Sequence, residues 1–227
     1  KVNAAVSELP KGTQLMCSWL PKGQRVFLYI VNGKGYLVIA FQLIHAQIGF
    51  DDNKNHIVGV MPNTFLAANG KPHSNTLCDG YLVNEMSPRS RNVMSRRSTP
   101  VITRLLLTDV VYINGMSLKS LPLGKRLTAL RKEVIDRLHD TKAKDAPAIQ
   151  NSPYKSVAMR DFWPIQQIKK IKHSLIPSLT HDAEGILIID AACPYVFGDA
   201  PSKLWLFSGN VDSVPSWRSL LQTRVIQ

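Results

Sequence analysis

Two runs of strand-forming residues joined by a short turn constrain the fold of this chain most strongly. Arg25 to Val31 and Gly35 to Phe41 are rich in branched aliphatic and aromatic residues, and residues 32–35, where they join, read NGKG. Asn-Gly dipeptides favour the tight turns that join antiparallel strands. The sequence therefore predicts a β-hairpin near the N-terminus, so the fold must contain an antiparallel sheet.

The rest of the chain supplies more strands and two helices. Further strand-forming runs are Thr76 to Val83, Val101 to Tyr112, Gly185 to Asp190 and Lys203 to Phe207. Apolar residues recur at helical spacing in two places. The first set is Leu127, Leu130, Val134 and Leu138; the second is Ile165, Ile168, Ile171 and Leu175, with Pro164 in the first turn. We predict one α+β domain over residues 1–227, with antiparallel sheets flanked by helices and a linker-like insertion at 141–153.

The charge of the chain indicates an anionic partner. It has 28 Lys and Arg against 16 Asp and Glu, a formal net charge of +12. Nucleic acid is the leading candidate for such a partner. Much of the excess lies in the segment 87–100, SPRSRNVMSRRSTP, which has no apolar period and is predicted to be a flexible basic loop. Two interpretations of the loop stay open: a solubilising insertion, or a phosphate-binding segment that uses Arg89, Arg91, Arg96 and Arg97.

Cysteine usage and hydropathy predict an intracellular protein, nuclear or cytoplasmic. Cys17, Cys78 and Cys193 are an odd number and lack zinc-ligand spacing, so we expect reduced, packed thiols and no metal site. The apolar runs are too short to span a bilayer, and no signal peptide is recognisable. We expect the chain to be a fragment, because it begins without Met and stops at Gln227.

Several blocks, taken in order, resemble a known family. These are TLCDGYLV, LLLTDVVYINGMSL, LPLGKRLTALRKEVI, DFWPIQQI, IPSLTHDAEGILIID, CPYVFG and KLWLF. Together they resemble the nucleotidyltransferase domain of eukaryotic mRNA guanylyltransferases, the capping enzymes related to DNA and RNA ligases. The resemblance runs from about Leu15 to about Leu220 and implies that fold, with no C-terminal oligonucleotide-binding fold in this chain.

The family's chemistry, carried over by resemblance, needs a lysine and carboxylates. The lysine amine attacks the α-phosphate of GTP and holds GMP covalently, and carboxylates hold the magnesium that neutralises the phosphates. Aligning Gly23 and Arg25 of SWLPKGQR with the family's lysine motif puts Leu20 at the nucleophile and Lys22 at its Asp.

Two later motifs also depart from the family pattern. Asp79 and Gly80 are present, but Tyr81 replaces a Glu that would support the metal or the ribose. The final motif, Lys-Trp-Lys in the family, reads Leu204, Trp205, Leu206. Losses of this kind each cost orders of magnitude in rate, so the sequence predicts a pseudoenzyme without catalytic residues or a cofactor. One alternative stays open: a residual guanylyltransferase that uses Lys22 after a register slip.

A second resemblance suggests what such a domain could bind. LMCSWL and KLWLF are similar to segments of the trimethylguanosine-cap-binding domain of snurportin, where a tryptophan like Trp205 stacks on the cap base. A methylated guanine is a delocalised cation, which an aromatic face attracts without catalytic charge. The sequence therefore predicts that RNA, with a capped or methylated 5′ end, is the partner. The predicted ligand-binding residues are Trp205, Trp19, Met16, Arg25, Asp79 and Glu184.

Other interpretations of the same residues stay open. Tryptophans are more often core residues than ligand platforms, which applies to Trp19 and Trp205. Asp79, Asp109 and Glu184 could be vestigial groups held by hydrogen bonds. The whole domain could also be an architectural subunit of a ribonucleoprotein or translation-related complex, with protein partners docking on the inactive fold.

Overall fold

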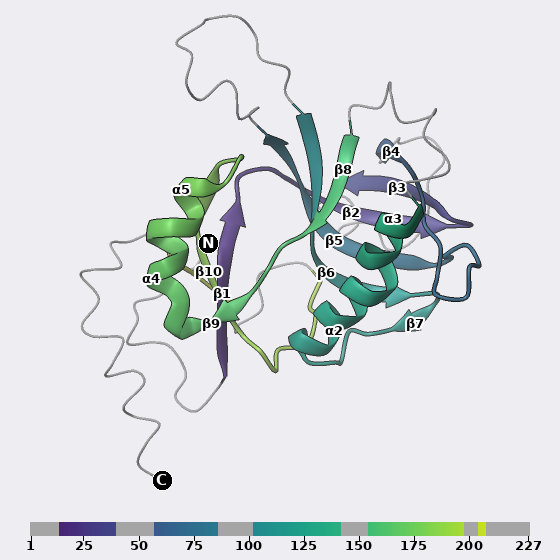
Figure 1. The fold of residues 1–227 in the computed structure, drawn as a ribbon. Helices are drawn as coiled ribbons and strands as arrows, with labels where there is room; N and C mark the ends of the chain where they lie inside the picture. Colours follow the sequence, from purple (N-terminus) through teal and green to yellow (C-terminus); the bar gives the residue numbers. More distant parts are fainter. Residues whose placement is uncertain (1–13, 40–56, 86–101, 142–153, 198–203, 208–227) are drawn as a thin grey trace, which may run out of the picture.

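The chain forms two β-sheets, each covered by a helical segment (Figure 1). The computed structural model describes residues 14–39, 57–85, 102–141, 154–197 and 204–207. The smaller sheet, sheet A, has the strand order β11-β10-β1-β9. Its strands are β1 (Leu15–Pro21), β9 (Trp163–Pro164), β10 (Ala183–Asp190) and β11 (Leu204–Phe207).

The larger sheet, sheet B, has seven strands in the order β4-β3-β2-β5-β6-β7, with β8 paired in parallel to β6. Its strands are β2 (Gln24–Val31), β3 (Lys34–Ile39), β4 (Ile57–Thr64), β5 (Thr76–Glu85), β6 (Ile102–Ile113), β7 (Met116–Ser117) and β8 (Tyr154–Met159). Apart from β8, neighbouring strands run antiparallel. The predicted α+β class with helix-flanked antiparallel sheets is confirmed.

The predicted hairpin is formed by β2 and β3. Asn32 and Gly33 at its tip have φ angles of 50° and 74°, the left-handed conformation that Asn and Gly tolerate best. The observed second strand ends at Ile39, and residues 40 and 41 of the predicted strand lie outside the described residues. The hairpin fixes Tyr29 directly opposite Tyr36.

The first predicted helix covers one face of sheet B (Figure 1). It is continuous through α2 (Leu123–Ala129), a π-helical segment η3 (Leu130–Ile135) and α3 (Asp136–Thr141). The predicted apolar stripe is buried, and three of its members pack on sheet residues such as Leu28, Leu37 and Val110. Burial of this stripe, at about 25 cal/mol per Å² of apolar surface, stabilises the larger half of the domain.

The second predicted helix covers sheet A. It is built from four short consecutive turns, η5 (Ile165–Gln167), α4 (Ile168–Lys170), the π-helical η6 (Ile171–Leu175) and α5 (Ile176–Ser178). Ile165, Ile168 and Ile171 pack against Cys17, Ile186 and Ile188 of the sheet. Pro164, which was predicted to lie in the first turn, is instead the last residue of β9 and directly precedes that turn.

The sequence analysis missed five strands, namely β1, β4, β7, β8 and β9. Residues Leu15 to Pro21 were not predicted to form a strand, whereas they form a central strand between β10 and β9. Such segments become strands because they pair with segments distant in the sequence. Local strand propensity does not predict such pairing. The basic loop 87–100 lies outside the described residues. So does the predicted linker 141–153, except that Thr141 ends α3.

Two further observations concern the predicted cellular setting. The three cysteines are buried thiols, as predicted. Within the described part of the chain, no helix is long and apolar enough to cross a membrane.

The two sheets meet where β1 turns into β2, at Lys22 and Gly23. The Lys22 N–H donates to the carbonyl oxygen of Asp182, 2.9 Å away, which ties this turn to β10. A Cβ atom at Gly23 would lie far inside van der Waals distance of the Leu82 backbone carbonyl. Gly23 is therefore required by the close approach of two backbones, a structural reason that is independent of catalysis.

This close approach generates a stability prediction. Gly23→Ala should lower the free energy of unfolding by about 1–3 kcal/mol, because the rigid Leu82 carbonyl has to move. Gly124→Ala is the matched control: Gly124 is exposed in the first turn of α2, and its Cβ would have no neighbour within 4 Å. It should leave stability unchanged or raise it by up to about 1 kcal/mol. Urea unfolding checks both, and equal midpoints for the two variants would contradict the packing argument.

Candidate functional site

Two carboxylates face each other across neighbouring strands of sheet B. Asp79 in β5 is directly opposite Asp109 in β6. Both are buried, with 4% and 8% of their surfaces exposed. Like charges directly opposite in a sheet repel, and burial makes an unpaired charge still more costly. Each carboxylate therefore needs its own counter-charge.

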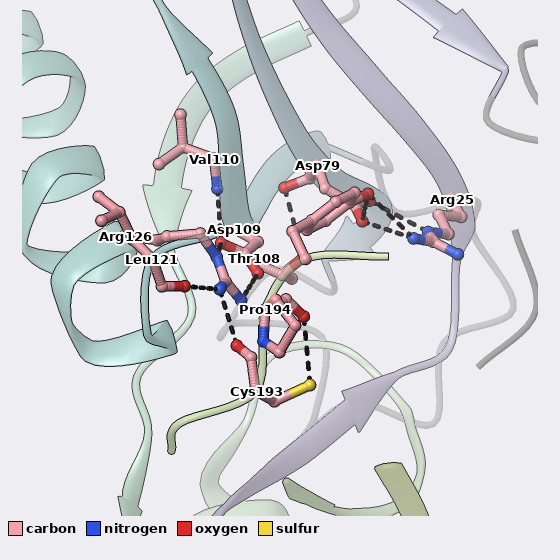
Figure 2. Close-up of polar contacts among 10 residues, drawn as sticks. Arg25, Asp79, Thr108, Asp109, Val110, Leu121, Arg126, Cys193 and Pro194 are labelled. Atoms are coloured by element: carbon pink, nitrogen blue, oxygen red, sulfur yellow. Dashed lines mark hydrogen bonds and ion pairs between the residues drawn. The ribbon is translucent and has the colours of Figure 1, made fainter. Parts of the chain in front are cut away.

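Arg25 and Tyr195 together bind Asp79. Arg25 in β2 makes a bidentate contact, with Nε 3.1 Å from Oδ1 and the second bond going to Oδ2 (Figure 2). The Tyr195 hydroxyl donates to the same Oδ2 at 2.7 Å. Burial opposes charge on Arg25, but the hydrogen bond and charge of Asp79 prevail and raise the pKa of Arg25. The pKa of Tyr195 is raised by burial and by Asp79, so its phenol keeps the proton that it donates.

Arg126, at the start of the helix over sheet B, neutralises Asp109. Its Nε and Nη2 donate to Oδ1 and Oδ2 of Asp109 at 2.9 and 2.8 Å. Its remaining Nη1 donates to the carbonyl oxygens of Leu121 and Cys193 (Figure 2). Burial raises the pKa of Asp109, while Arg126 acts in the opposite direction. One buried guanidinium thus joins β6, the start of α2 and the segment after β10.

Arginine neutralises both carboxylates, which weakens their attraction for a magnesium ion. Magnesium takes oxygen ligands in near-octahedral geometry. Both oxygens of Asp79 and both oxygens of Asp109 accept from arginine, and Asp109 Oδ1 also accepts the Val110 N–H at 2.8 Å. Nowhere in the described ranges do three His, Cys, Asp or Glu side chains gather in a way that could hold a metal.

The position predicted for the nucleophile is occupied by a half-buried leucine. Leu20 lies in β1 opposite Gly185 of β10. Lys22, the alternative nucleophile, lies on the turn after β1 with 66% of its side chain exposed, and its Nζ is 3.8 Å from Asp182 Oδ2. A solvated ammonium with a carboxylate partner lacks the desolvation that activates an amine for attack.

Tyr81 and Glu184 flank the same region. Tyr81 lies opposite Arg25 in the register of β5 and β2. Its pKa is raised by burial in the first place, and Glu184 and Asp79 add to that effect. Glu184 is exposed, and the β1–β10 register shifts by one residue at this point. Of the predicted ligand-binding residues, Arg25, Asp79 and Glu184 are therefore gathered around Tyr81.

Three site residues were not assigned from the sequence, namely Tyr195, Arg126 and Arg160. Arg160 follows β8 and is 4% exposed; its Nη1 donates to the Trp19 carbonyl at 3.1 Å and its guanidinium lies 4.7 Å from the Phe162 ring centroid. Burial lowers its pKa to about 10. Tyr195 and Arg126 do lie within blocks of family resemblance, CPYVFG and LPLGKRLTALRKEVI, but only the tertiary structure shows what they bind.

The structure places Trp19 in the core. It is 5% exposed, its indole N–H donates to His181 Nε2 at 3.1 Å, and its ring centroid is 5.8 Å from that of Trp163. Burial does not favour the predicted stacking role, so the core interpretation of Trp19 fits better. Because the indole N–H of Trp19 has a hydrogen-bond partner, this polar group can be buried in the core.

Met16 and Trp205 lie on strands that β10 separates. Met16 is opposite Ile189 of β10, and it helps to line a hollow of about 370 Å³ beside α2. Trp205 is opposite Ile188 of β10, and its neighbours Leu206 and Leu204 are opposite Leu187 and Ile189. A base held between Met16 and Trp205 stays a prediction. Arg89, Arg91, Arg96 and Arg97 lie outside the described residues.

Comparison with known proteins identifies a family and related folds. The family described as mRNA capping enzyme, catalytic domain, matches residues 5–206. The chain is 24% identical over 160 residues to the mRNA-capping enzyme subunit alpha of Kluyveromyces lactis, covering 70% of this chain and 33% of that protein. It is 25% identical over 152 residues to the Saccharomyces cerevisiae protein of the same name, covering 67% and 31%. The chain thus spans about a third of the length of these relatives.

A solved structure supports the fold assignment. The structure titled "mycobacterial DNA ligase D complexed with ATP and MES" superposes with a TM-score of 0.50 at 14% sequence identity, covering 91% of this chain and 57% of that one. At this identity the similarity shows the fold alone. The expected guanylyltransferase/ligase-like nucleotidyltransferase fold is confirmed.

Proposed function

The chain belongs to the family of mRNA capping enzyme catalytic domains, and we propose that it is a non-catalytic member that binds RNA at a capped or methylated 5′ end. It acts as an intracellular reader of RNA ends, in the nucleus or the cytoplasm, without nucleotidyl transfer. The RNA or protein partners of such a reader belong to a ribonucleoprotein assembly.

One observation carries the loss of catalysis. Leu20 occupies the position of the nucleophile while Asp79 has both oxygens bound by Arg25 and Tyr195. A leucine side chain cannot attack phosphorus, and a carboxylate that a guanidinium already neutralises attracts a metal ion less. Loss of either function costs orders of magnitude in rate. The leucine at the nucleophile position and the neutralised carboxylate together support the loss of catalysis.

The charge and the remaining aromatic residue support RNA as the ligand. A net charge of +12 favours a polyanion, and the arginines of loop 87–100 are the proposed phosphate contacts. Trp205 is the proposed stacking residue for a methylated guanine, and β11, which contains it, is an edge strand of sheet A. Leu204 and Leu206, where the family has lysines, weaken triphosphate binding in favour of flat base recognition.

The absence of transfer chemistry is directly testable. Incubation of the protein with α-labelled GTP and magnesium should leave no label on the chain after denaturing electrophoresis, because no activated amine is available. Lys22→Ala and Lys170→Ala should behave identically, Lys170 being an exposed lysine on the helix over sheet A. Label that disappears only in Lys22→Ala would establish a residual guanylyltransferase instead.

Cap recognition predicts a nucleotide preference. Tryptophan fluorescence should be quenched saturably by 7-methylguanosine or trimethylguanosine cap analogues, and less by guanosine or by GTP with magnesium. Trp205→Ala should weaken the cap affinity by about 5- to 150-fold, corresponding to about 1–3 kcal/mol of stacking, whereas Trp205→Phe keeps an aromatic face and most of the affinity. A folded protein that binds no cap analogue at low salt would favour the architectural role instead.

A further inference from the structure

A row of tyrosines crosses the larger sheet. Tyr29 of β2 is opposite Tyr36 of β3 and opposite Leu77 of β5, and Leu77 is opposite Tyr112 of β6. We call these four residues the tyrosine row. With strands about 4.8 Å apart, it extends over roughly 14 Å and four strands. All four side chains are half-buried, so each keeps part of its surface open to solvent.

The tyrosine row lies on the face of sheet B that the helix does not cover. The adjacent row, Leu37, Leu28, Cys78 and Val110, belongs to the core cluster that contains Leu130 and Val134 of the helix. Successive residues of a strand point to opposite faces, so the tyrosine row is on the other side. The Tyr29 hydroxyl there bonds Asn75 Oδ1 at 3.0 Å in an exposed position.

The row continues toward the Asp79 site. Phe27, two residues before Tyr29 on the same face, is opposite Asp79, and its ring centroid lies 6.0 Å from that of Phe197. Phe197 is 40% exposed and contacts Tyr195 edge to face, with centroids 5.1 Å apart. Phe27 itself is buried, so it connects the row to the Asp79 site beneath the surface, and Phe197 is the exposed ring at that end.

The charge around the row is cationic. Lys119 places its Nζ 5.8 Å from the Tyr112 ring centroid and 5.7 Å from that of Phe197. Lys34, two residues before Tyr36 on the same face of β3, is exposed. The two carboxylates beyond the row, Asp79 and Asp109, are each neutralised by an arginine. A polyanion with stackable rings fits these lysines and tyrosines.

We propose that the tyrosine row is a stacking platform for single-stranded RNA. The bases lie on Tyr29, Tyr36 and Tyr112 while Lys119 and Lys34 attract the phosphates. Antiparallel sheets with exposed aromatic residues stack two or three bases in other RNA-binding folds, and stacking tolerates any base sequence. The inference rests on the proposed function, which identifies the ligand as RNA. It goes further by giving the nucleotides that follow the 5′ end a binding surface separate from that of the cap.

The test compares two double variants of the full chain. Tyr29→Leu/Tyr112→Leu removes two stacking rings but keeps apolar bulk, and Tyr29→Phe/Tyr112→Phe keeps the rings but removes both hydroxyl groups. The probes are a 3′-fluorescein-labelled ten-nucleotide oligouridylate with an uncapped 5′ end, the same oligonucleotide with a 7-methylguanosine cap, and a free cap analogue. Fluorescence anisotropy measures the labelled probes at low and moderate salt, and thermal unfolding verifies that both variants fold.

The leucine variant should bind both oligonucleotides at least about tenfold more weakly and the free cap analogue as tightly as the wild type does, while the phenylalanine variant binds all three like the wild type. Unchanged oligonucleotide binding by the leucine variant would overturn the stacking platform. A wild-type protein that binds neither oligonucleotide would overturn it too. If the oligonucleotides bind through the tyrosine row but the cap analogue does not bind, the platform stands and cap reading fails.

Discussion

Two buried carboxylates placed directly opposite each other in a sheet determine how this domain is built. Asp79 and Asp109 are tolerated only because Arg25 and Arg126 each provide a bidentate counter-charge. Removing one partner of such a buried pair typically costs about 3–5 kcal/mol, because the other charge is left unpaired. The contacts that satisfy them also connect distant segments, since Tyr195 reaches Asp79 and Arg126 reaches the carbonyl of Cys193.

Under the proposed function, the motif residues of this domain have structural roles that do not depend on chemistry. Gly23 of the lysine motif is retained because two backbones approach each other there. Leu20 of the same motif has no comparable structural requirement, since it is only half-buried in β1. In the proposed non-catalytic domain, Gly23 thus has a structural role, and Leu20 has none that requires a particular side chain. RNA binding requires fewer precisely placed groups than catalysis does, because a positively charged, partly aromatic surface is sufficient for it.

The sequence predicted the elements with strong local patterns and missed those that depend on distant partners. The Asn-Gly hairpin and the two apolar stripes, at Leu127 to Leu138 and at Ile165 to Leu175, were predictable because spacing alone defines them. β1 was missed because it becomes a strand by pairing with β10, more than 160 residues later in the chain. Within the candidate site, the sequence motifs predicted which residues differ from the family pattern. They did not predict that Tyr195 binds Asp79 or that Trp19 is buried, because both depend on the tertiary packing.

The central claim is that Asp79 is a structural carboxylate and no longer a metal ligand. Calorimetric titration of GTP into the protein, once with magnesium and once with a chelator, tests this most directly. The account predicts the same GTP affinity in both titrations, because Arg25 already neutralises Asp79 and Tyr195 also binds its Oδ2. An affinity that rises about tenfold or more with magnesium, equivalent to about 1.4 kcal/mol, and that Asp79→Asn abolishes would contradict the account.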